Sequence, residues 1–334
     1  METVNCDLCG SNQSREVLQQ GDLIHAVSPE LFTVVRCPDC GLCYLNPRPT
    51  TSEIGRYYPD QYFTPPSPRS RSSLEMSAKR LSRRVKQWIM EDFYGYPGAG
   101  PRRPWHVLRK IILWPEQMRR LWRGRDIIPW VGAGRLLDVG CGPGGNLAVF
   151  QEQGWDVYGI EFSQAAVAQA RARVGDRIHA GTLDTAPYKD ETFDVIFLSH
   201  SLEHFFSPSE TLTRLRQLLA PHGQVVIAVP NADSLEARLF GPSWVPWDPP
   251  RHLYHFTPAT LRRLLEKCGL RVVRLRTGVG SLFFMASLDC AWERRCHCRL
   301  PMRKVIERLI VRPFCLAAGH LGYGTEIKVE AVKA

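Results

Sequence analysis

Four cysteines near the start of the sequence have the spacing of metal ligands. They form two C-x-x-C-G pairs, at Cys6, Cys9, Cys37 and Cys40. Each pair can direct two thiolates at one ion, and the glycine after it permits a tight turn. Two such pairs complete a closed tetrahedral site, so we predict a structural zinc ion in a zinc-ribbon-like module. A thioredoxin-type redox role would require a βαβ context that these pairs lack.

A second candidate site is the glycine-rich stretch at residues 135–145. Asp138 ends an apolar run, Gly140, Gly142 and Gly144 follow, and helical sequence begins after them. A strand, a glycine turn and a helix form half of a nucleotide-binding βαβ unit. Together with Gly145, the glycines satisfy G-x-G-x-x-G, a weak dinucleotide signal. Because the Asp138 charge disfavours a pyrophosphate, a cationic ligand such as S-adenosylmethionine suits this loop better.

The stretch from Leu137 to Gly144 resembles the first motif of class I S-adenosylmethionine-dependent methyltransferases. Residues 154–161 continue the resemblance as a second strand that ends in an acid, Glu161, placed to accept both ribose hydroxyls. The fold implied is α/β, a Rossmann-like seven-stranded sheet with helices on both faces and a last strand inserted antiparallel. The cofactor contacts implied are Asp138, Gly140, Cys141, Gly142, Gly144, Glu161, Phe162, Thr182, Leu183 and Ser199. Thr182 stands where many relatives carry an aspartate.

Three residues with catalytic chemistry are predicted at the same edge of the sheet. Glu203 and His204 follow the fourth core strand, and His255 precedes a late helix. In one interpretation, His204 or His255 is a general base. In a second, all three bind a divalent metal, an arrangement similar to that of ubiquinone-biosynthesis O-methyltransferases and small-RNA 2′-O-methyltransferases. In a third, they only cap a helix and brace the sheet.

The acceptor is left open by the sequence. The cysteine pairs, the core and a late histidine block resemble bacterial methyltransferases of cell-surface polysaccharide, glycolipid or secondary-metabolite pathways. We therefore expect a small-molecule, sugar or lipid-linked acceptor. Residues 240–248 hold Trp244 and Trp247, which would suit either an acceptor pocket or a packed loop. The alternatives are a non-catalytic methyltransferase-fold subunit with a zinc module, and an NAD(P)-dependent enzyme.

Composition and charge limit the partners. The chain has 334 residues, 44% of them hydrophobic, and a net charge of +10. Without a secretory signal or an 18-residue apolar run, a cytoplasmic protein is expected, and its eleven cysteines favour thiols or metal ligands. Basic residues at 69–86 and 102–125 indicate either a solvated helix face or a surface for anions, including peripheral contact with the inner membrane. Nucleic acid is disfavoured because no stacking platform accompanies them.

The elements that position these residues divide the chain into three expected parts. Residues 1–50 form the zinc module, 51–133 a linker and helical cap, and 134–334 the methyltransferase domain. Apolar residues at helical spacing predict two basic helices, over 74–93 and 105–122. A segment at 294–324 is expected as an insertion before the last strand, with a basic amphipathic helix. The sequence does not indicate the oligomeric state.

Overall fold

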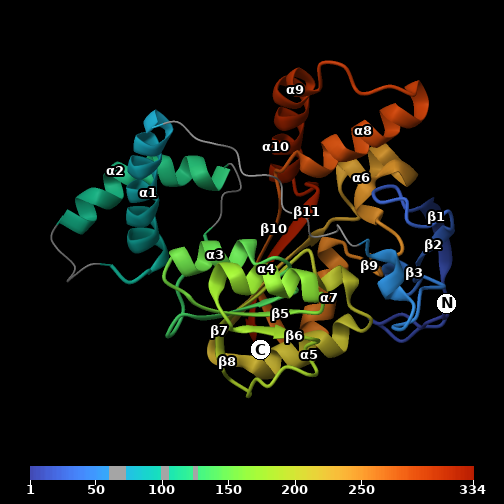
Figure 1. Cartoon of the computed structure of the whole chain (residues 1–334), viewed down its shortest axis with the longest axis horizontal. Helices are drawn as coiled ribbons and strands as arrows, with labels where there is room; N and C mark the ends of the chain where they lie inside the picture. The colour runs from blue at the N-terminus through green and yellow to red at the C-terminus, as the bar shows by residue number, and fades with distance from the viewer. Residues whose placement is uncertain (60–72, 99–104, 123–126) are drawn as a thin grey trace. The chain divides into compact units, whose positions relative to one another are not determined.

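The computed structural model describes residues 1–59, 73–98, 105–122 and 127–334. The chain forms two units (Figure 1). The core unit consists of Met1–Phe63 with Arg135–Ala334, and the helical unit is Thr64–Gly134. Residues 1–63, which include the expected zinc module, therefore group with the core. Residues 60–72, part of the segment 51–133 expected as a linker and helical cap, lie outside the described residues.

The core unit is built on a seven-stranded sheet in the order β10-β11-β8-β7-β4-β5-β6. Its strands are β4 (Arg135–Val139), β5 (Asp156–Glu161), β6 (Ile178–Ala180), β7 (Phe193–Ser199), β8 (Leu219–Pro230), β10 (Leu270–Thr277) and β11 (Glu326–Lys333). The central strands run parallel, whereas β11 pairs antiparallel with both β8 and β10. This confirms the predicted sheet, including the inserted last strand.

Helices cover both faces of this sheet. They are α3 (Gly145–Glu152), α4 (Gln164–Val174), α5 (Pro208–Leu218) and α7 (Pro258–Lys267). Helices α3 and α4 lie side by side, and α5 packs beside α7 on the opposite face (Figure 1). Local sequence sets their starts: Ser163 accepts a hydrogen bond from the Ala166 amide, and Thr257 forms a capping box with Thr260. The near-continuous apolar run of β7 fits a strand that is covered on both sides.

A second, four-stranded antiparallel sheet contains the first residues of the chain. Its order is β1-β2-β3-β9, with β1 (Arg15–Gly21), β2 (Leu31–Arg36), β3 (Cys43–Leu45) and β9 (Tyr254–His255). The short strand β9 therefore comes from more than 200 residues later in the chain. Buried residues of this sheet belong to the same hydrophobic cluster as those of the large sheet. The N-terminal module and the core thus share one interior.

The helical unit consists of α1 (Ser73–Tyr94) and α2 (Trp105–Trp122), which confirms the two predicted helices. Arg109 on α2 holds Asp92 on α1 through hydrogen bonds of 2.6 and 2.7 Å. No helix of the described residues is long and apolar enough to cross a membrane.

The remaining short elements connect the strands of the core unit. They are η1 (Ile54–Tyr57), η2 (Leu202–His204), α6 (Leu235–Phe240), η3 (Gly241–Ser243), η4 (Val245–Trp247), α8 (Leu282–Cys296), α9 (Arg303–Ile306), η5 (Glu307–Val311) and α10 (Arg312–His320). The expected insertion thus begins earlier than residue 294, with α8. Trp244 and Trp247 are buried against each other with ring centroids 5.1 Å apart, so their rings pack in the interior of the core unit.

Candidate active site

The glycine loop, residues 140–145, joins β4 to the first turn of α3. Gly140, Gly142 and Gly144 have φ values of 77°, 52° and 77°, a region that other residues rarely adopt. A Cβ on Gly140 would lie 2.7 Å from the Cβ of Ser201. Both the backbone conformation and the space therefore require glycine here. The loop places the N-terminus of α3 at the carboxyl edge of the parallel strands, where ligands bind in such folds.

Glu161, the last residue of β5, fastens the glycine loop to its neighbouring strand. Its Oε2 accepts a hydrogen bond of 2.9 Å from the Gly142 amide, and its Oε1 accepts one of 2.8 Å from the Ser163 amide. Burial raises the pKa of this carboxyl, and the amide donors oppose that effect. Glu161 is thus an acceptor held in place by backbone groups at the edge of the glycine loop.

Asp138 is a buried carboxyl group with an unused oxygen. It is 1% exposed, and its Oδ2 has no hydrogen-bond partner among the described residues. Burial, with a further contribution from the nearby Glu161, raises the pKa of Asp138 to about 8. An unpartnered buried carboxyl is costly unless a donor or cation completes it. The position therefore favours a ligand that carries positive charge.

The other expected cofactor residues lie along the same edge. Thr182 and Leu183 follow β6, where the Gly181 amide donates to the Glu161 carbonyl at 2.9 Å. Ser199 ends β7, the strand beside β4, and Cys141 is buried in the glycine loop. Phe162 directly follows Glu161 and is 54% exposed. The structure thus brings the expected residues to one edge of the sheet.

A second group of polar side chains, the histidine cluster, consists of Glu203, His204 and His252. One potential ligand atom from each residue lies within 4.8 Å of the others. Glu203 is fully buried, and neither of its carboxylate oxygens has a hydrogen-bond partner in the described part of the chain. Burial alone would raise the pKa of Glu203, but the surrounding histidines bring it to about 2. The cluster therefore contains a buried carboxylate whose nearest donor, His200 Nδ1, lies outside the cluster, 3.5 Å from Oε1.

Backbone carbonyls fix the tautomers of both clustered histidines. His204 Nδ1 lies 3.0 Å from the carbonyl oxygen of Arg251, and His252 Nδ1 lies 2.8 Å from that of Pro246. Because a carbonyl oxygen only accepts, each Nδ1 carries a proton, and in the neutral form of each ring the lone pair is therefore on Nε2. Burial, and then the neighbouring His252, lower the pKa of His204 to about 4. His204 is thus neutral near pH 7 and can act as a base or a metal ligand.

His255 does not join the histidine cluster. Its ring packs against Trp247 with centroids 4.8 Å apart, and burial lowers its pKa to about 3. His252 occupies the place that sequence reasoning gave to His255. The spacing of His252 and His255 indicates that only one of them can face the cluster, because residues three apart in an extended segment face opposite sides. The Leu253 amide, between the two histidines, donates a hydrogen bond of 2.8 Å to the Glu203 carbonyl. This bond fixes which of the two histidines faces the histidine cluster.

His200 stands beside the cluster as a charged residue. Its Nε2 lies 2.8 Å from Oε1 of Glu326, and its Nδ1 lies 3.5 Å from Oε1 of Glu203. Burial alone would lower its pKa, but the two carboxylates raise it to about 10. His200 therefore serves as a cation between two acids and not as a neutral ligand.

Comparisons with known proteins identify the domain that holds both groups. Residues 113–275 match the family described as "Methyltransferase domain". The chain contains a methyltransferase domain. This span includes the glycine loop, Glu161 and the histidine cluster.

Curated relatives are similar over parts of the chain. A 37.1 kDa protein in transposon TN4556 of Streptomyces fradiae is 36% identical over 30% of this chain and 31% of its own length. A malonyl-[acyl-carrier protein] O-methyltransferase of Erwinia billingiae is 30% identical over 37% and 49%. A protein of Mycolicibacterium smegmatis named for S-adenosylmethionine-dependent methyl transfer is 25% identical over 53% and 63%. The chain thus spans less than two thirds of each of these relatives.

The four cysteines form a compact cysteine cluster beside the methyltransferase domain. One Sγ atom from each lies within 4.8 Å of the others, with Cys6–Cys40 at 3.4 Å and Cys9–Cys37 at 3.5 Å. Gly10 and Gly41 have φ values of 78° and 81° at the turn after each pair. The arrangement is compatible with a zinc module.

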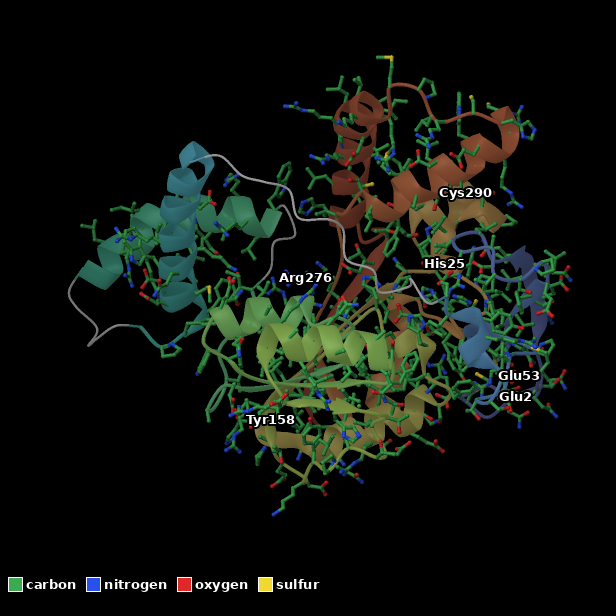
Figure 2. All side chains as sticks on the ribbon, in the orientation of Figure 1. Glu2, His25, Glu53, Tyr158, Arg276 and Cys290 are labelled. Atoms are coloured by element: carbon green, nitrogen blue, oxygen red, sulfur yellow. The ribbon has the colours of Figure 1, made fainter. Side chains whose placement is uncertain are left out.

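Several side chains fasten the N-terminal residues to the methyltransferase domain. The Asp7 carboxylate, inside the first cysteine pair, accepts 2.8 Å hydrogen bonds from the amide and hydroxyl of Ser209 on α5. Arg48 donates a 2.7 Å bond to the Phe206 carbonyl and a 2.8 Å bond to Glu2, which is labelled in Figure 2. The cysteine cluster is therefore part of the same body as the candidate active site.

Tyr58 connects the cofactor edge with the histidine cluster. Its ring lies edge-on to Phe162 with centroids 5.6 Å apart, and its hydroxyl lies 3.1 Å from Nδ1 of His204. Sequence reasoning missed Tyr58, because it lies 146 residues before His204 in a tyrosine-rich stretch without a motif. The N-terminal segment thus contributes a side chain to the candidate active site.

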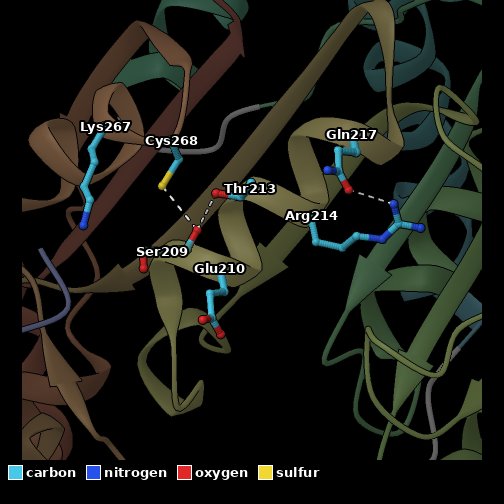
Figure 3. A pocket seen from close by; sticks show the side chains of 7 residues that line it. All are labelled: Ser209, Glu210, Thr213, Arg214, Gln217, Lys267 and Cys268. Atoms are coloured by element: carbon cyan, nitrogen blue, oxygen red, sulfur yellow. Dashed lines mark hydrogen bonds between the residues drawn. The ribbon is translucent and has the colours of Figure 1, made fainter. Parts of the chain in front are cut away.

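A surface hollow of about 370 Å³ lies between α5 and α7 and contains none of these site residues (Figure 3). Its polar groups bond to one another: Thr213 Oγ1 and Cys268 Sγ both donate to the Ser209 carbonyl, at 2.8 and 3.4 Å. The hollow is a gap between two covering helices and not part of the cofactor edge.

Proposed function

We propose that this protein is an S-adenosylmethionine-dependent methyltransferase that acts on a small-molecule, sugar or lipid-linked acceptor. The observation that carries the proposal is the glycine loop with Asp138 on one side and Glu161 on the other, inside a methyltransferase domain. The name of the Mycolicibacterium smegmatis relative supports the cofactor, and that of the Erwinia billingiae relative supports methyl transfer to a carrier-bound acceptor.

The residues at this edge fit that cofactor. The positive φ angles of the glycine loop bring backbone, without side chains, to the ligand position. The unpartnered Oδ2 of Asp138 suits a cationic group, and Glu161 is an acceptor suited to ribose hydroxyls. When bound, S-adenosylmethionine supplies a methyl group on a sulfonium, which a nucleophilic acceptor atom can take.

The work left to the chain is positioning and the exclusion of water. An acceptor held in line with the methyl group gains most of its rate from orientation, because the sulfonium already activates the methyl. Tyr58 and Phe162 lie between the cofactor edge and the histidine cluster, so they are the side chains best placed to cover an acceptor. His204, neutral and with its Nε2 lone pair available, can take a proton from an acceptor hydroxyl or amine.

A second role for the same cluster is favoured by a specific observation. Neither buried oxygen of Glu203 has a hydrogen bond from within the cluster, and two histidines whose Nδ1 atoms are held by carbonyls direct Nε2 as a potential ligand atom. Carbonyl-oriented histidines and a carboxylate are a common ligand set for a divalent metal. We therefore propose a divalent metal held by Glu203, His204 and His252, in place of the expected set that contained His255. Bound there, the metal would polarise an acceptor oxygen.

The cysteine cluster is proposed as a structural zinc site. Four thiolates close the tetrahedron and leave no open position for a reacting group. Its role is to hold the N-terminal sheet in the position where Tyr58 reaches His204. Zinc analysis of the purified chain tests this assignment.

Isothermal titration with S-adenosylmethionine, S-adenosylhomocysteine and NADH tests the main proposal. We expect both adenosyl ligands to bind and NADH not to bind. Gly142→Val should abolish binding, since φ is 52° there and a side chain would occupy the ligand space. Binding of NADH without a response to either adenosyl ligand would favour a dinucleotide enzyme instead. Cofactor binding without methyl transfer to any acceptor tested by intact mass would favour a non-catalytic subunit.

A further inference from the structure

The outer face of α2 is apolar and exposed. Five aliphatic and aromatic side chains on it are each exposed by 47–66%: Val107, Leu108, Ile111, Ile112 and Trp114. Trp122, at the end of the helix, is 58% exposed. At 100° per residue, these positions fall on one side of the helix. An apolar stripe of this length on a single helix is unusual for a surface that only contacts water.

The polar side of α2 faces α1. Arg109 bonds Asp92, Gln117 Nε2 donates to the Tyr94 hydroxyl at 2.7 Å, and Leu113 between them is buried. An amphipathic helix normally turns its apolar side to its neighbour and its charged side to water. In the helical unit this order is reversed. The ring of Trp114 lies 6.3 Å from that of Phe93 on α1, but packing of the two helices leaves the four aliphatic side chains of the face exposed: Val107, Leu108, Ile111 and Ile112.

The charge of the helical unit indicates what covers this face. Residues 64–134 contain 15 Lys and Arg but five Asp and Glu, a net charge of +10. The net charge of the whole chain is also +10, so the residues outside 64–134 have a net charge of zero. All of the excess positive charge therefore belongs to the unit that carries the exposed apolar helix face.

We propose that residues 64–134 are a membrane-surface module, with α2 lying in the interface of an anionic bilayer. A basic, amphipathic helix with tryptophans beside aliphatic residues inserts its apolar face among acyl chains, while lysine and arginine attract anionic headgroups. A nucleic acid would neutralise the positive charge but would leave the aliphatic face exposed to water. A second copy of the chain would cover the aliphatic face but would bring together two units that each carry a charge of +10, which repel each other. The proposal goes beyond methyl transfer and does not depend on it.

Co-sedimentation of the full chain with lipid vesicles tests the proposal. We expect binding to vesicles that contain about one third phosphatidylglycerol and little binding to pure phosphatidylcholine. Binding should weaken between about 0.1 M and 1 M salt, as the screening length falls from about 10 Å to about 3 Å. Equal binding to both kinds of vesicle, or none to either, would overturn the proposal.

A pair of matched double variants locates the contact. Ile111→Glu with Ile112→Glu should weaken vesicle binding by at least about tenfold, because two apolar side chains are lost from the interface and two negative charges are added. Both positions are solvent-exposed, at 65% and 66%, so the fold should persist. The control is Leu309→Glu with Ile310→Glu on η5, at 67% and 64% exposure, which should leave binding unchanged. Loss of binding in the control alone, or in neither pair, would contradict the assignment to α2.

Discussion

Arg251 donates two hydrogen bonds to Asp22, of 2.6 Å from Nη2 and 3.0 Å from Nη1, although 229 residues separate them in sequence. Both side chains are fully buried, and Asp248 takes a further bond of 3.1 Å from Arg251 Nε. The carbonyl of the same arginine bonds His204. One ion pair thus joins the N-terminal sheet to the backbone that orients a histidine of the candidate active site.

Removal of the Asp22 charge should destabilise the core unit. Asp22→Asn leaves the buried charge of Arg251 with Asp248 as its remaining carboxylate partner. Breaking a buried ion pair costs roughly 3–5 kcal/mol of folding free energy. Urea unfolding measures the loss. The matched control is Asp233→Asn, which removes the surface pair with Arg238, where Asp233 is 49% exposed, and should cost at most about 1 kcal/mol. Equal effects of the two substitutions would contradict a structural role for the buried pair.

Cofactor affinity should rise with pH through the titration of Asp138. In the ligand-free protein its pKa is about 8, so the carboxyl is mostly protonated at pH 7. A bound cation favours the carboxylate and lowers this pKa, so binding releases a proton and tightens as pH rises toward 8, by at most about tenfold per pH unit. Calorimetry from pH 6 to 8, in buffers of different ionisation enthalpy, measures the number of protons released when the cofactor binds. Asp138→Asn should bind more weakly and without this pH dependence; an unchanged pH profile in that variant would refute the assignment.

Loss of zinc should disturb more than the cysteine cluster. Cys37→Ser should release the proposed zinc, and because β3 pairs with β9 the disturbance should reach Tyr254 and His255. Hydrogen exchange should show faster exchange in β9, alongside elemental analysis of zinc. Cys290→Ser, at a half-buried thiol far along the chain (labelled in Figure 2), should keep one zinc and normal exchange. A stable β9 in zinc-free protein would mean that the sheet does not need the metal.

Metal binding at the histidine cluster should depend on His252 and not on His255. Glu203→Gln and His252→Ala should each reduce affinity for magnesium, manganese or zinc at this second site by at least about 100-fold, since even outer-shell changes cost 10–100-fold. His255→Phe, which keeps a ring against Trp247, should bind normally. Equilibrium dialysis with zinc-loaded protein separates this site from the cysteine cluster.

If chelation leaves methyl transfer unchanged while His204→Ala abolishes it, His204 acts as a base without metal.

Local patterns in the sequence were sufficient to predict the large sheet. The glycine loop, the acid at the end of β5 and the capping Thr257 are each defined within a few residues, and the structure has them where expected. The partners of the N-terminal residues were not predictable in this way. Strand β9 is two residues long, and Tyr58 and Arg251 lie in stretches without periodicity, so only tertiary packing brings them to their partners.

The late arrival of β9 has a consequence for synthesis of the protein on the ribosome. All four cysteines leave the ribosome early, and β3 follows directly. At roughly 5–20 residues per second, the roughly 200 residues between β3 and β9 take roughly 10–40 s to add. During that interval the nascent N-terminal sheet has an open edge, which is a site for incorrect strand pairing. The final step in building the sheet beside the cysteine cluster therefore waits for the synthesis of Tyr254 and His255.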